Sequence, residues 1–317
     1  MRFRQFEVFH AVMTTGGVSD AAQRLGISQP SVTKTLQLLE AELGYRLFDR
    51  IKGRLHPTEE ARLLMREAER AQAAMDDLRE ASLRLRHGSQ DHLRIVATPA
   101  LGHEVLPDAV TTFARQKADI RLTISTRHSG EVLEEIAKPS FGFDLGFVFD
   151  AGGRPASIGA MRIGTVPIAT VSRPRTFARP GPEVGIDDLV GRTVIGLDDT
   201  EPLGKLVADL SRTSGLMINS PIRVQTYRLA CALALRDNGV AIVDGMTAAS
   251  VAQDHVDAEV RLFPPDLSLP VNAVYPLSTG LPLTSREFVE VFEKALASQL
   301  ARLRRRLRGT ARRESKD

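Results

Sequence analysis

The chain has 317 residues, of which 43% are hydrophobic and 26% are charged, a composition that suits a globular protein of two or three domains. A single cysteine excludes an internal disulfide and a multi-cysteine zinc site, and no metal or cofactor is expected. The sequence has neither a run of roughly 18 apolar residues nor the apolar core of a signal peptide near its start, so we expect a cytoplasmic protein without a membrane span.

The net charge of +3 is unevenly distributed along the chain. Residues 301–317 contain eight Lys and Arg residues and two acids, so the preceding 300 residues are slightly acidic as a group. Residues 1–58 contain eight basic and five acidic residues. The overall basic balance is therefore no evidence for nucleic-acid binding, and any such function has to depend on where the basic residues of the first segment lie.

Residues 18–43 are typical of two short helices joined by a tight turn, packed on a first helix that carries Phe3, Phe6 and Phe9. Ser19 and Ser28 are placed to cap the two helices, and Gly26 is placed to end the first, because glycine adopts the left-handed conformation at little cost. The apolar face of the second helix repeats at Val32, Leu36, Leu39 and Leu43. Its other face offers side chains to a DNA major groove, namely Gln29, Pro30, Ser31, Thr33 and Lys34. The alternative is an amphipathic hairpin whose polar face is only solvated.

A hairpin, or wing, is predicted around Lys52 and Gly53. Arg50, Lys52 and Arg54 alternate along it, and a period of two projects them to one side, where they can pair with phosphates. A solvated charged hairpin is the alternative. Thr58 then caps a predicted helix from Glu59 to about Arg86.

This long helix has an unbroken series of small and apolar residues at steps of three and four. The series consists of Ala61, Leu64, Ala68, Ala71, Met75, Leu78, Ser82 and Leu85. Such a seam is typical of a helix that pairs two subunits, and an isolated helix of this length needs a partner. The alternative is that the seam packs on the protein's own domains.

After a polar break at residues 87–91, strands alternate with helices, which indicates an α/β domain with a largely parallel sheet. Strands are predicted at 92–97, 121–126, 144–149, 162–171, 193–197, 222–225, 240–243, 260–263 and 271–275. Helices are predicted at 105–117, 130–137, 203–214, 227–236 and 285 to about 306.

Polar side chains follow the ends of several predicted strands, where α/β domains bind their ligands. The candidate effector-binding residues are Thr98, Pro99, Ala100, Thr126, Arg127, Ser129, Asp150, Thr200, Glu201 and Asp244. Thr98, Arg127 and Ser129 are suited to a carboxylate, whereas Asp150, Glu201 and Asp244 are suited to an ammonium group. For Ser129, capping of the following helix is an equally good interpretation.

The order of these parts resembles the LysR-type transcriptional regulators. The resemblance is carried by AAQRLGISQPSVTKTLQLLEAELGYRLFDR (Ala21 to Arg50) and RLHPTEEA (Arg54 to Ala61), and the whole chain fits the layout. It implies an α/β multi-domain protein with a winged helix-turn-helix domain (1–58), a dimerising linker helix (59–87), a two-lobed effector-binding domain similar to periplasmic solute-binding proteins (92–300) and a basic tail (301–317).

The family implies a homodimer, extended to a tetramer, that binds a pseudo-palindromic operator, with RNA polymerase as a further candidate partner. Effector binding closes the lobes and moves the linker helices, which changes the spacing of the recognition helices. The segments LRIVATPAL (Leu93 to Leu101) and ACALALRDNGVAIVDGMTA (Ala230 to Ala248) resemble the branch that senses lysine-pathway amino acids and opines. Many relatives have Pro-Phe at Gly245-Met246 and Arg at Gly204, so the ligand can differ from theirs.

Other functions were weighed against this one. The sequence has no GxSxG elbow, HExxH helix, P-loop or GxGxxG after a strand, so an enzyme is not expected. A solute-binding protein fits residues 92–300 but has no use for a winged helix. Cys231 lies in an apolar run and is interpreted as a core residue in preference to a redox switch. The basic tail either contacts DNA flanks or RNA, or is simply solvated.

Overall fold

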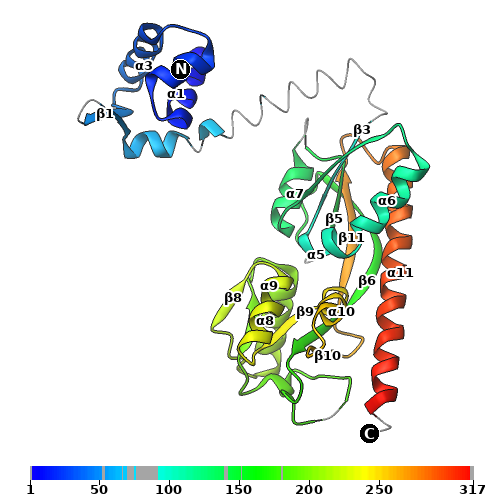
Figure 1. The fold of residues 1–317 in the computed structure, drawn as a ribbon. Helices are drawn as coiled ribbons and strands as arrows, with labels where there is room; N and C mark the ends of the chain where they lie inside the picture. Colours follow the sequence, from blue (N-terminus) through cyan, green and yellow to red (C-terminus); the bar gives the residue numbers. More distant parts are fainter. Residues whose placement is uncertain are drawn as a thin grey trace. The chain divides into compact units, whose positions relative to one another are not determined.

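The computed structural model describes residues 2–51, 54–65, 67–69, 75, 92–138, 142–150, 152–179 and 181–314, with the backbone alone at 50, 51, 54 and 306–314. The chain divides into two compact units, Met1–Arg86 and His87–Asp317 (Figure 1). Each unit is described by itself. Within the described residues, none of the helices combines the length and apolar character that a membrane span requires.

The N-terminal unit contains the three predicted helices, α1 (Phe3–Thr15), α2 (Val18–Leu25) and α3 (Gln29–Leu43). Phe9, Val32 and Leu39 are fully buried in their common core. Each helix ends at a glycine with positive φ, and the predicted stop at Gly26 is confirmed. The predicted cap at Ser19 is wrong, because α2 begins at Val18, two residues earlier than a cap at Ser19 implies, and its N-cap is Gly17.

A two-stranded hairpin follows α3, as predicted for a wing. It pairs β1 (Phe48–Ile51) with β2 (Arg54–Pro57) in antiparallel register. A carboxylate oxygen of Glu40 in α3 accepts hydrogen bonds from the backbone amides of Leu47 (2.7 Å) and Phe48 (3.1 Å), which attaches the hairpin to the recognition helix. Thr58 accepts a hydrogen bond from the amide of Ala61 and so caps the next helix, as expected.

The described part of the linker is helical at residues 59–65, 67–69 and 75. Ala61 and Ala68 are buried in the core formed by α1 to α3, and Leu64 packs against it. The first positions of the predicted seam therefore pack on the protein's own N-terminal unit, which was the alternative interpretation. The later seam positions Ala71, Leu78, Ser82 and Leu85 lie outside the described residues.

The second unit is built on one mixed sheet with the strand order β4-β3-β5-β11-β6-β9-β7-β8, with β10 also paired to β6. The first lobe contains β3 (His92–Ala97), α5 (Pro99–Glu104), α6 (Leu106–Gln116), β4 (Arg121–Thr126), α7 (Ser129–Ala137) and β5 (Leu145–Phe149). The second lobe contains the short 3-10 turn Asp187–Leu189, β7 (Val194–Leu197), α8 (Pro202–Ser214), β8 (Ile222–Val224), α9 (Tyr227–Arg236), β9 (Val240–Asp244), α10 (Gly245–Asp254) and β10 (Glu259–Leu262).

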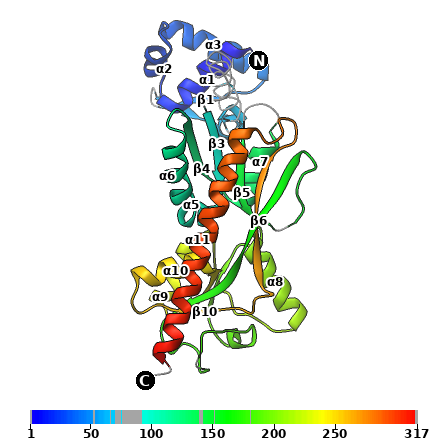
Figure 2. The same cartoon turned by 90° about the vertical axis from the view of Figure 1, so that its right-hand side faces the viewer.

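Two long strands, β6 (Ile158–Ser172) and β11 (Ser268–Pro276), connect the lobes. β6 pairs with β11 along its first part and with β9 along its last part, so it runs from one lobe into the other (Figure 2). Both strands are antiparallel to their neighbours, whereas β4-β3-β5 and β9-β7-β8 are parallel. The expectation of a largely parallel sheet thus holds within each lobe and fails where the chain crosses between them.

The C-terminal helix α11 (Leu283–Glu314) lies alongside both lobes (Figure 2). Its Phe292 ring stacks on Phe147 of β5 with a centroid distance of 3.7 Å, and Phe288 contacts Phe113 of α6. These rings belong to a hydrophobic core that extends through both lobes, so the lobes share apolar packing on this face.

Two helices of the second unit were missed from the sequence. α5 has six residues and includes Pro99 and Gly102, and α10 begins with Gly245 and is only ten residues long, with the weaker helix formers Thr247, Ser250 and Val251 among them. Both follow directly after a strand: Thr98, the residue after β3, is the N-cap of α5, and Asp244, the last residue of β9, is the N-cap of α10. The first turns of these two helices lie at the strand ends where ligand-binding residues were expected.

Candidate functional site

The recognition helix α3 exposes most of the residues predicted to contact DNA. Gln29, Pro30, Ser31 and Lys34 are exposed, whereas Thr33 is half-buried beside the hairpin. Ser28 occupies the N-cap position as predicted, but its hydroxyl lies 2.9 Å from the hydroxyl of Ser31 and makes no cap hydrogen bond. The N-terminal turn of α3 therefore presents hydroxyl, amide and ammonium groups to solvent.

The register of the hairpin determines on which face each of its cationic positions lies. Arg50 lies opposite Leu55 and Arg54 lies opposite Ile51. Because directly opposite residues share a face, position 54 lies on the face of position 51 and position 50 lies on the other, so the prediction that a period of two places both on one side is wrong. Lys52 lies outside the described residues, and the side chains of Arg50 and Arg54 are not described either.

In the second unit, the ends of strands from both lobes meet, as expected. The hydroxyl of Ser129 at the start of α7 donates a 2.8 Å hydrogen bond to Oε2 of Glu201, which directly precedes α8 in the second lobe. Nδ1 of His128 lies 3.1 Å from Oε1 of the same carboxylate. The N-cap of α7 is His128, so the interpretation of Ser129 as a helix cap is wrong, and its side chain bridges the lobes instead.

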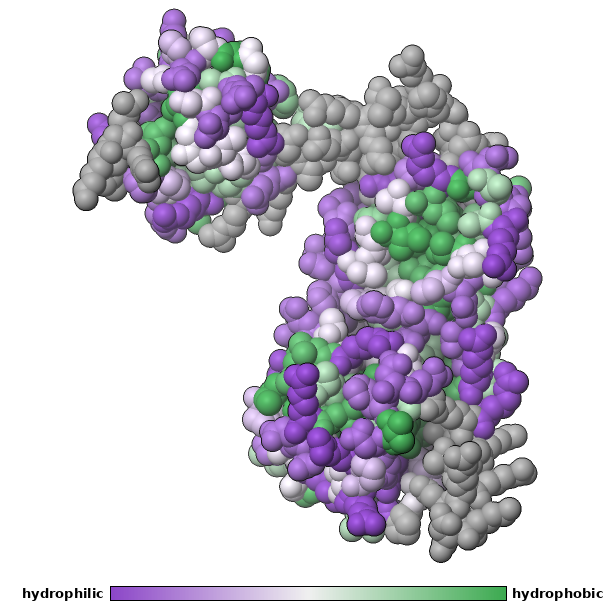
Figure 3. All heavy atoms as spheres, in the orientation of Figure 1, coloured by the Kyte–Doolittle hydropathy of each residue, from purple (hydrophilic) through white to green (hydrophobic). Residues whose placement is uncertain are grey.

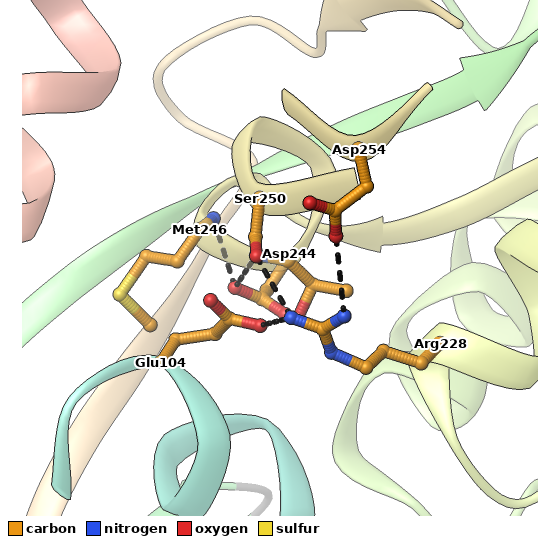
Figure 4. Close-up of polar contacts among 7 residues, drawn as sticks. Glu104, Arg228, Asp244, Met246, Ser250 and Asp254 are labelled. Carbon is orange, nitrogen blue, oxygen red and sulfur yellow. Dashed lines mark hydrogen bonds and ion pairs between the residues drawn. The ribbon is translucent and has the colours of Figure 1, made fainter. Parts of the chain in front are cut away.

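A second bridge between the lobes was not foreseen from the sequence. Arg228 in the first turn of α9 donates 2.7 Å hydrogen bonds to Glu104 at the end of α5 and to Ser250 in α10 (Figure 4). Asp254 lies 3.9 Å from the same guanidinium group. Neither Glu104 nor Arg228 lies in a recognisable motif, and only the packing of α5 against α9 and α10 brings them together.

Asp244 is the most unusual of the predicted residues. It is fully buried at the N-cap of α10, where Oδ1 accepts hydrogen bonds from the amides of Met246 (2.9 Å) and Thr247 (3.0 Å). Burial raises the pKa of this carboxyl to about 6, and the nearby carboxylate of Glu104 adds to the shift, whereas the Thr247 side chain and the two capping amides oppose it. Its other oxygen, Oδ2, has no hydrogen-bond partner among the described residues.

Three buried hydroxyls, those of Thr98, Thr170 and Thr247, share this property with Asp244, and two of the three lie at the starts of α5 and α10. Thr98 at the N-cap of α5 and Thr247 in α10 are 4% and 1% exposed, and neither hydroxyl has a hydrogen-bond partner within the described part of the chain. The helices that carry them contact each other. Unpaired buried polar atoms are rare in folded proteins, so this group of atoms is a candidate for contacts with a ligand.

Some of the remaining predicted residues line a common cavity, and the others do not. Ser129, Asp150 and Thr200 line one cavity of about 190 Å³ between the lobes. Thr126 packs its methyl group against Gly102, and the guanidinium of Arg127 is exposed and turns back to the carbonyl of Thr126. Pro99 and Ala100 form the first turn of α5. The structure therefore does not bring Thr126 and Arg127 together with the other candidates.

Cys231 and the adjacent Tyr227 are core residues of α9. Burial, with a smaller effect of the Asp244 carboxylate, raises the pKa of the Cys231 thiol to about 12, which disfavours the reactive thiolate. Tyr227 is buried, and its ring lies 6.0 Å from Phe149 of the first lobe. No group of three His, Cys, Asp or Glu residues suited to a metal ion occurs among the residues that the structure describes.

Comparison with known families accounts for both units. Residues 3–62 match the model of the bacterial regulatory helix-turn-helix protein of the lysR family, and residues 86–297 match the model of the LysR substrate binding domain. The chain belongs to the LysR-type transcriptional regulators. It is thus a DNA-binding regulator with an effector-binding domain, as the sequence predicted, and not an enzyme.

Individual relatives of this LysR-type regulator agree with the assignment. The HTH-type transcriptional regulator DgcR from Pseudoalteromonas sp is 33% identical over 275 residues, which cover 87% of this chain and 93% of DgcR. The octopine catabolism/uptake operon regulatory protein OccR from Rhizobium meliloti is 28% identical over 64% of this chain and 61% of OccR. The structure of full-length CbnR with its target DNA shares the fold, with a TM-score of 0.69 and 21% identity over 93% of this chain and all of CbnR.

Two glycines of this LysR-type regulator, Gly204 in α8 and Gly245 at the start of α10, leave little room for a side chain. A Cβ atom on Gly204 would lie 2.1 Å from the carbonyl oxygen of Asp198, and one on Gly245 would lie 2.9 Å from Leu303 of α11. The contact at Gly204 is with a backbone atom, so the backbone would have to move. At Gly245 the end of the Leu303 side chain can give way, but the carbonyl oxygen of Pro167 lies 3.1 Å from the same Cβ position.

Proposed function

We propose that this regulator is controlled by a small effector that carries a positively charged nitrogen, such as an amino acid or an opine, bound between the two lobes. The observation that carries the proposal is the free Oδ2 of Asp244, a buried carboxylate oxygen without a hydrogen-bond partner among the described residues. A carboxylate buried in this way is stabilised by a cationic partner more than by any neutral one.

The charges around Asp244 support a cationic ligand. Asp244 and Glu201 both raise the pKa of the buried Tyr227 hydroxyl, after the larger effect of burial, and Glu104 raises that of Asp244. Three carboxyl groups thus influence this part of the interlobe region, whereas Arg228 is already bonded to Glu104 and Ser250. The hydroxyls of Thr98 and Thr247 are available for the polar groups of the same ligand. OccR, one of the relatives, is named for octopine, which supports an opine or amino acid.

Closure of the lobes is the proposed link between the effector and DNA. Contacts of Ser129 and Arg228 with the opposite lobe are made only when the lobes are close together, so a ligand that stabilises them shifts the population toward the closed form. On the surface, hydrophilic side chains lie over the boundary between the lobes, with hydrophobic patches on either side (Figure 3). A change of lobe packing would then move the linker helices and the recognition helices attached to them.

We propose that the protein binds DNA in the cytoplasm as a dimer, assembled into a tetramer, on a pseudo-palindromic operator. The candidate base contacts come from the exposed first turns of α3, and the candidate phosphate contacts come from the hairpin cations Arg50, Lys52 and Arg54. RNA polymerase is a candidate partner of the bound regulator. A gel-shift assay with the DNA upstream of its own gene tests this part: binding to that DNA in excess of random DNA is expected, and equal binding contradicts the proposal.

The effector is tested by calorimetry of the full chain with amino acids, opines and matched carboxylic acids that lack the nitrogen. Binding is expected only for ligands with the cationic group, and Asp244→Asn should weaken it at least tenfold while retaining the helix cap. Asp254→Asn removes a nearby exposed carboxylate and serves as the control. Binding by the nitrogen-free acids alone, or equal binding by both variants, contradicts the proposed class of effector.

A further inference from the structure

The C-terminal helix α11 extends beyond the part of the chain that matches the family model. That match ends at residue 297, whereas α11 continues as one helix to Glu314 (Figure 2). Leu296 is buried beside β6, and Leu303 is buried beside Gly245 at the start of α10. Leu303 is also the last buried residue of α11 among the described side chains. The helical backbone thus continues for about 16 Å beyond its last described contact with the lobes.

This extension of α11 is strongly basic. Residues 302–313 contain seven arginines and neither a lysine nor an acid. The preceding part of the helix, residues 283–301, contains three glutamates and two cations and is nearly balanced in charge. The charge of the extension is therefore not neutralised by acids of the same segment.

The arginines whose side chains are described are accessible to a partner. Arg302 lies 3.6 Å from Asp108 of α6, and its side chain is still 59% exposed. Arg304 and Arg305 are exposed, and neither has an acidic partner among the residues that the structure describes. Nε of Arg305 donates a long hydrogen bond of 3.4 Å to the carbonyl of Ala301, one turn earlier in the helix. The guanidinium groups of Arg304 and Arg305 therefore have donors to offer.

The helix dipole explains only part of this charge. Cations stabilise a helix within about its last turn, because the unpaired carbonyl groups are found there. The arginines begin three turns before the end of α11, and pairs at positions 304 and 308 or 308 and 312 place like charges four residues apart, which destabilises a helix. A polyanion that binds along the helix removes this repulsion.

The kind of cation and its spacing favour phosphate groups as the partner. The guanidinium group of arginine matches a phosphate with two parallel hydrogen bonds, whereas lysine offers a single point of charge. Seven arginines along 302–313 give one charge for roughly 2.5 Å of helix. Double-stranded DNA carries one negative charge for about 1.7 Å of its axis, so the two charge densities are similar.

The side chains that other phosphate-bearing partners need are missing from this segment. Single-stranded nucleic acids are bound by aromatic side chains that stack on bases, and the chain has no aromatic residue after Phe292. A helix that lies on a membrane inserts an apolar face into it. Leu303 and Leu307 are the large apolar residues of 302–313, and Leu303 is already buried on the second lobe.

We infer that residues 302–313 bind the phosphate backbone of double-stranded DNA without reading its sequence. The effector-binding unit then makes a DNA contact of its own. This contact goes beyond the proposed function, in which the DNA contacts come from α3 and the hairpin of the N-terminal unit.

The test measures binding of the full chain to a random-sequence duplex at several salt concentrations by fluorescence anisotropy. The triple variant Arg304→Gln, Arg305→Gln, Arg308→Gln should weaken binding about tenfold at low salt and lower the salt dependence by about two to three charges. Glutamine is a good helix former, so the variant retains the helix. Arginine-to-lysine changes at the same three positions keep the charge and should retain at least about a third of the affinity.

A matched control removes the same charge elsewhere. Arg115→Gln, Arg286→Gln and Lys294→Gln together remove three exposed cations from α6 and from the first part of α11, and this variant should change the affinity less than about twofold. Equal losses in the two triple variants overturn the inference, and so does an unchanged salt dependence for the variant of the extension.

Further probes distinguish the partner. With single-stranded DNA or with vesicles of phosphatidylserine and phosphatidylcholine, the variant of the extension should lose less affinity than with the duplex, and a larger loss overturns the assignment to double-stranded DNA. The ratio of binding to the DNA upstream of the gene and to random DNA should stay within about twofold, since phosphate contacts carry no sequence information. A changed ratio contradicts a contact with the backbone alone. The random duplex requires neither an operator nor an effector, so this test stands if the proposed effector class fails.

Discussion

The hydroxyl of Ser129 donates a 2.8 Å hydrogen bond to Glu201, and this contact joins residues that lie 72 positions apart in two different lobes. Both side chains are largely buried at the contact. The closed arrangement of the lobes therefore depends in part on a hydrogen bond between a neutral donor and a carboxylate, which is stronger than one between neutral groups.

Replacement of Ser129 by alanine should loosen this closed arrangement. The change leaves the Glu201 carboxylate with one hydrogen bond fewer, so the free energy of unfolding should fall by about 1–2 kcal/mol. Small-angle scattering should show a larger radius of gyration for the isolated effector-binding unit. An equivalent change at Ser298, an exposed serine of α11, serves as the control, and equal effects of both variants would show that the hydrogen bond does not hold the lobes.

The pair of Glu104 and Arg228 should make a smaller contribution than its distance suggests. The Arg228 side chain is 42% exposed, and solvent screens an exposed ion pair. A double-mutant cycle with Glu104→Gln and Arg228→Gln should give a coupling energy of about 0.5–1 kcal/mol, decreasing with added salt. A coupling that is zero at low salt would contradict an interaction across the lobes.

Asp244 should make folding stability depend on pH. Its pKa is raised from 3.8 to about 6 in the folded chain, so the protonated form favours folding, and the stabilisation present below pH 4 is lost as the pH rises through about 6. Asp244→Asn cannot titrate at this position. The unfolding free energy of Asp244→Asn, relative to that of the native chain, should therefore increase between pH 4 and pH 7 by on the order of 3 kcal/mol.

Denaturant unfolding over this pH range measures the effect. Asp254→Asn, which changes an exposed carboxylate of the same helix, should give a nearly flat difference from the native chain. If the difference in unfolding free energy between Asp244→Asn and the native chain does not change with pH, burial does not raise the pKa of the Asp244 carboxyl.

Gly204 should not tolerate even an alanine. The added Cβ would lie 2.1 Å from the carbonyl oxygen of Asp198, so the start of α8 has to move, at a cost of about 3 kcal/mol in unfolding free energy. Gly130 in α7 has no atom within 4 Å of such a Cβ, and alanine there should be neutral or stabilising by up to about 1 kcal/mol. Thermal unfolding compares the melting temperatures of the two variants. Equal melting temperatures would contradict the close approach of position 204 to the carbonyl oxygen of Asp198.

Ser31 and Lys34 should differ in how they contribute to DNA binding. If the exposed Ser31 contacts a base edge, Ser31→Ala changes the preferred operator sequence and leaves binding to random DNA unchanged. If Lys34 pairs with a phosphate, Lys34→Gln weakens binding to all sequences and lowers the salt dependence by about one charge. Gel-shift titrations at several salt concentrations measure both effects, and a uniform loss for Ser31→Ala would assign it to the backbone instead.

The sequence by itself determined most of the elements and their order, with α5 and α10 as the exceptions. Gly26, Pro30 and the apolar repeat of α3 are local signals, and each depends only on residues within a few positions along the chain. The apolar strands of the second unit were predicted for the same reason. The long strand β6 was predicted too short, since its first residues depend on pairing with β11, more than 100 positions away in sequence.

The site was predictable only as a set of residue types at strand ends. Ser129 fits a helix cap as well as a contact across the lobes, and the sequence contains no signal that links Glu104 with Arg228, 124 residues later. Likewise, the sequence does not show that Asp244, which caps α10, is buried in the folded chain with its Oδ2 atom unpaired among the described residues. Local hydrogen bonding and periodicity determine secondary structure, whereas the partner of a polar side chain depends on which distant surfaces pack together, and this the tertiary structure alone decided.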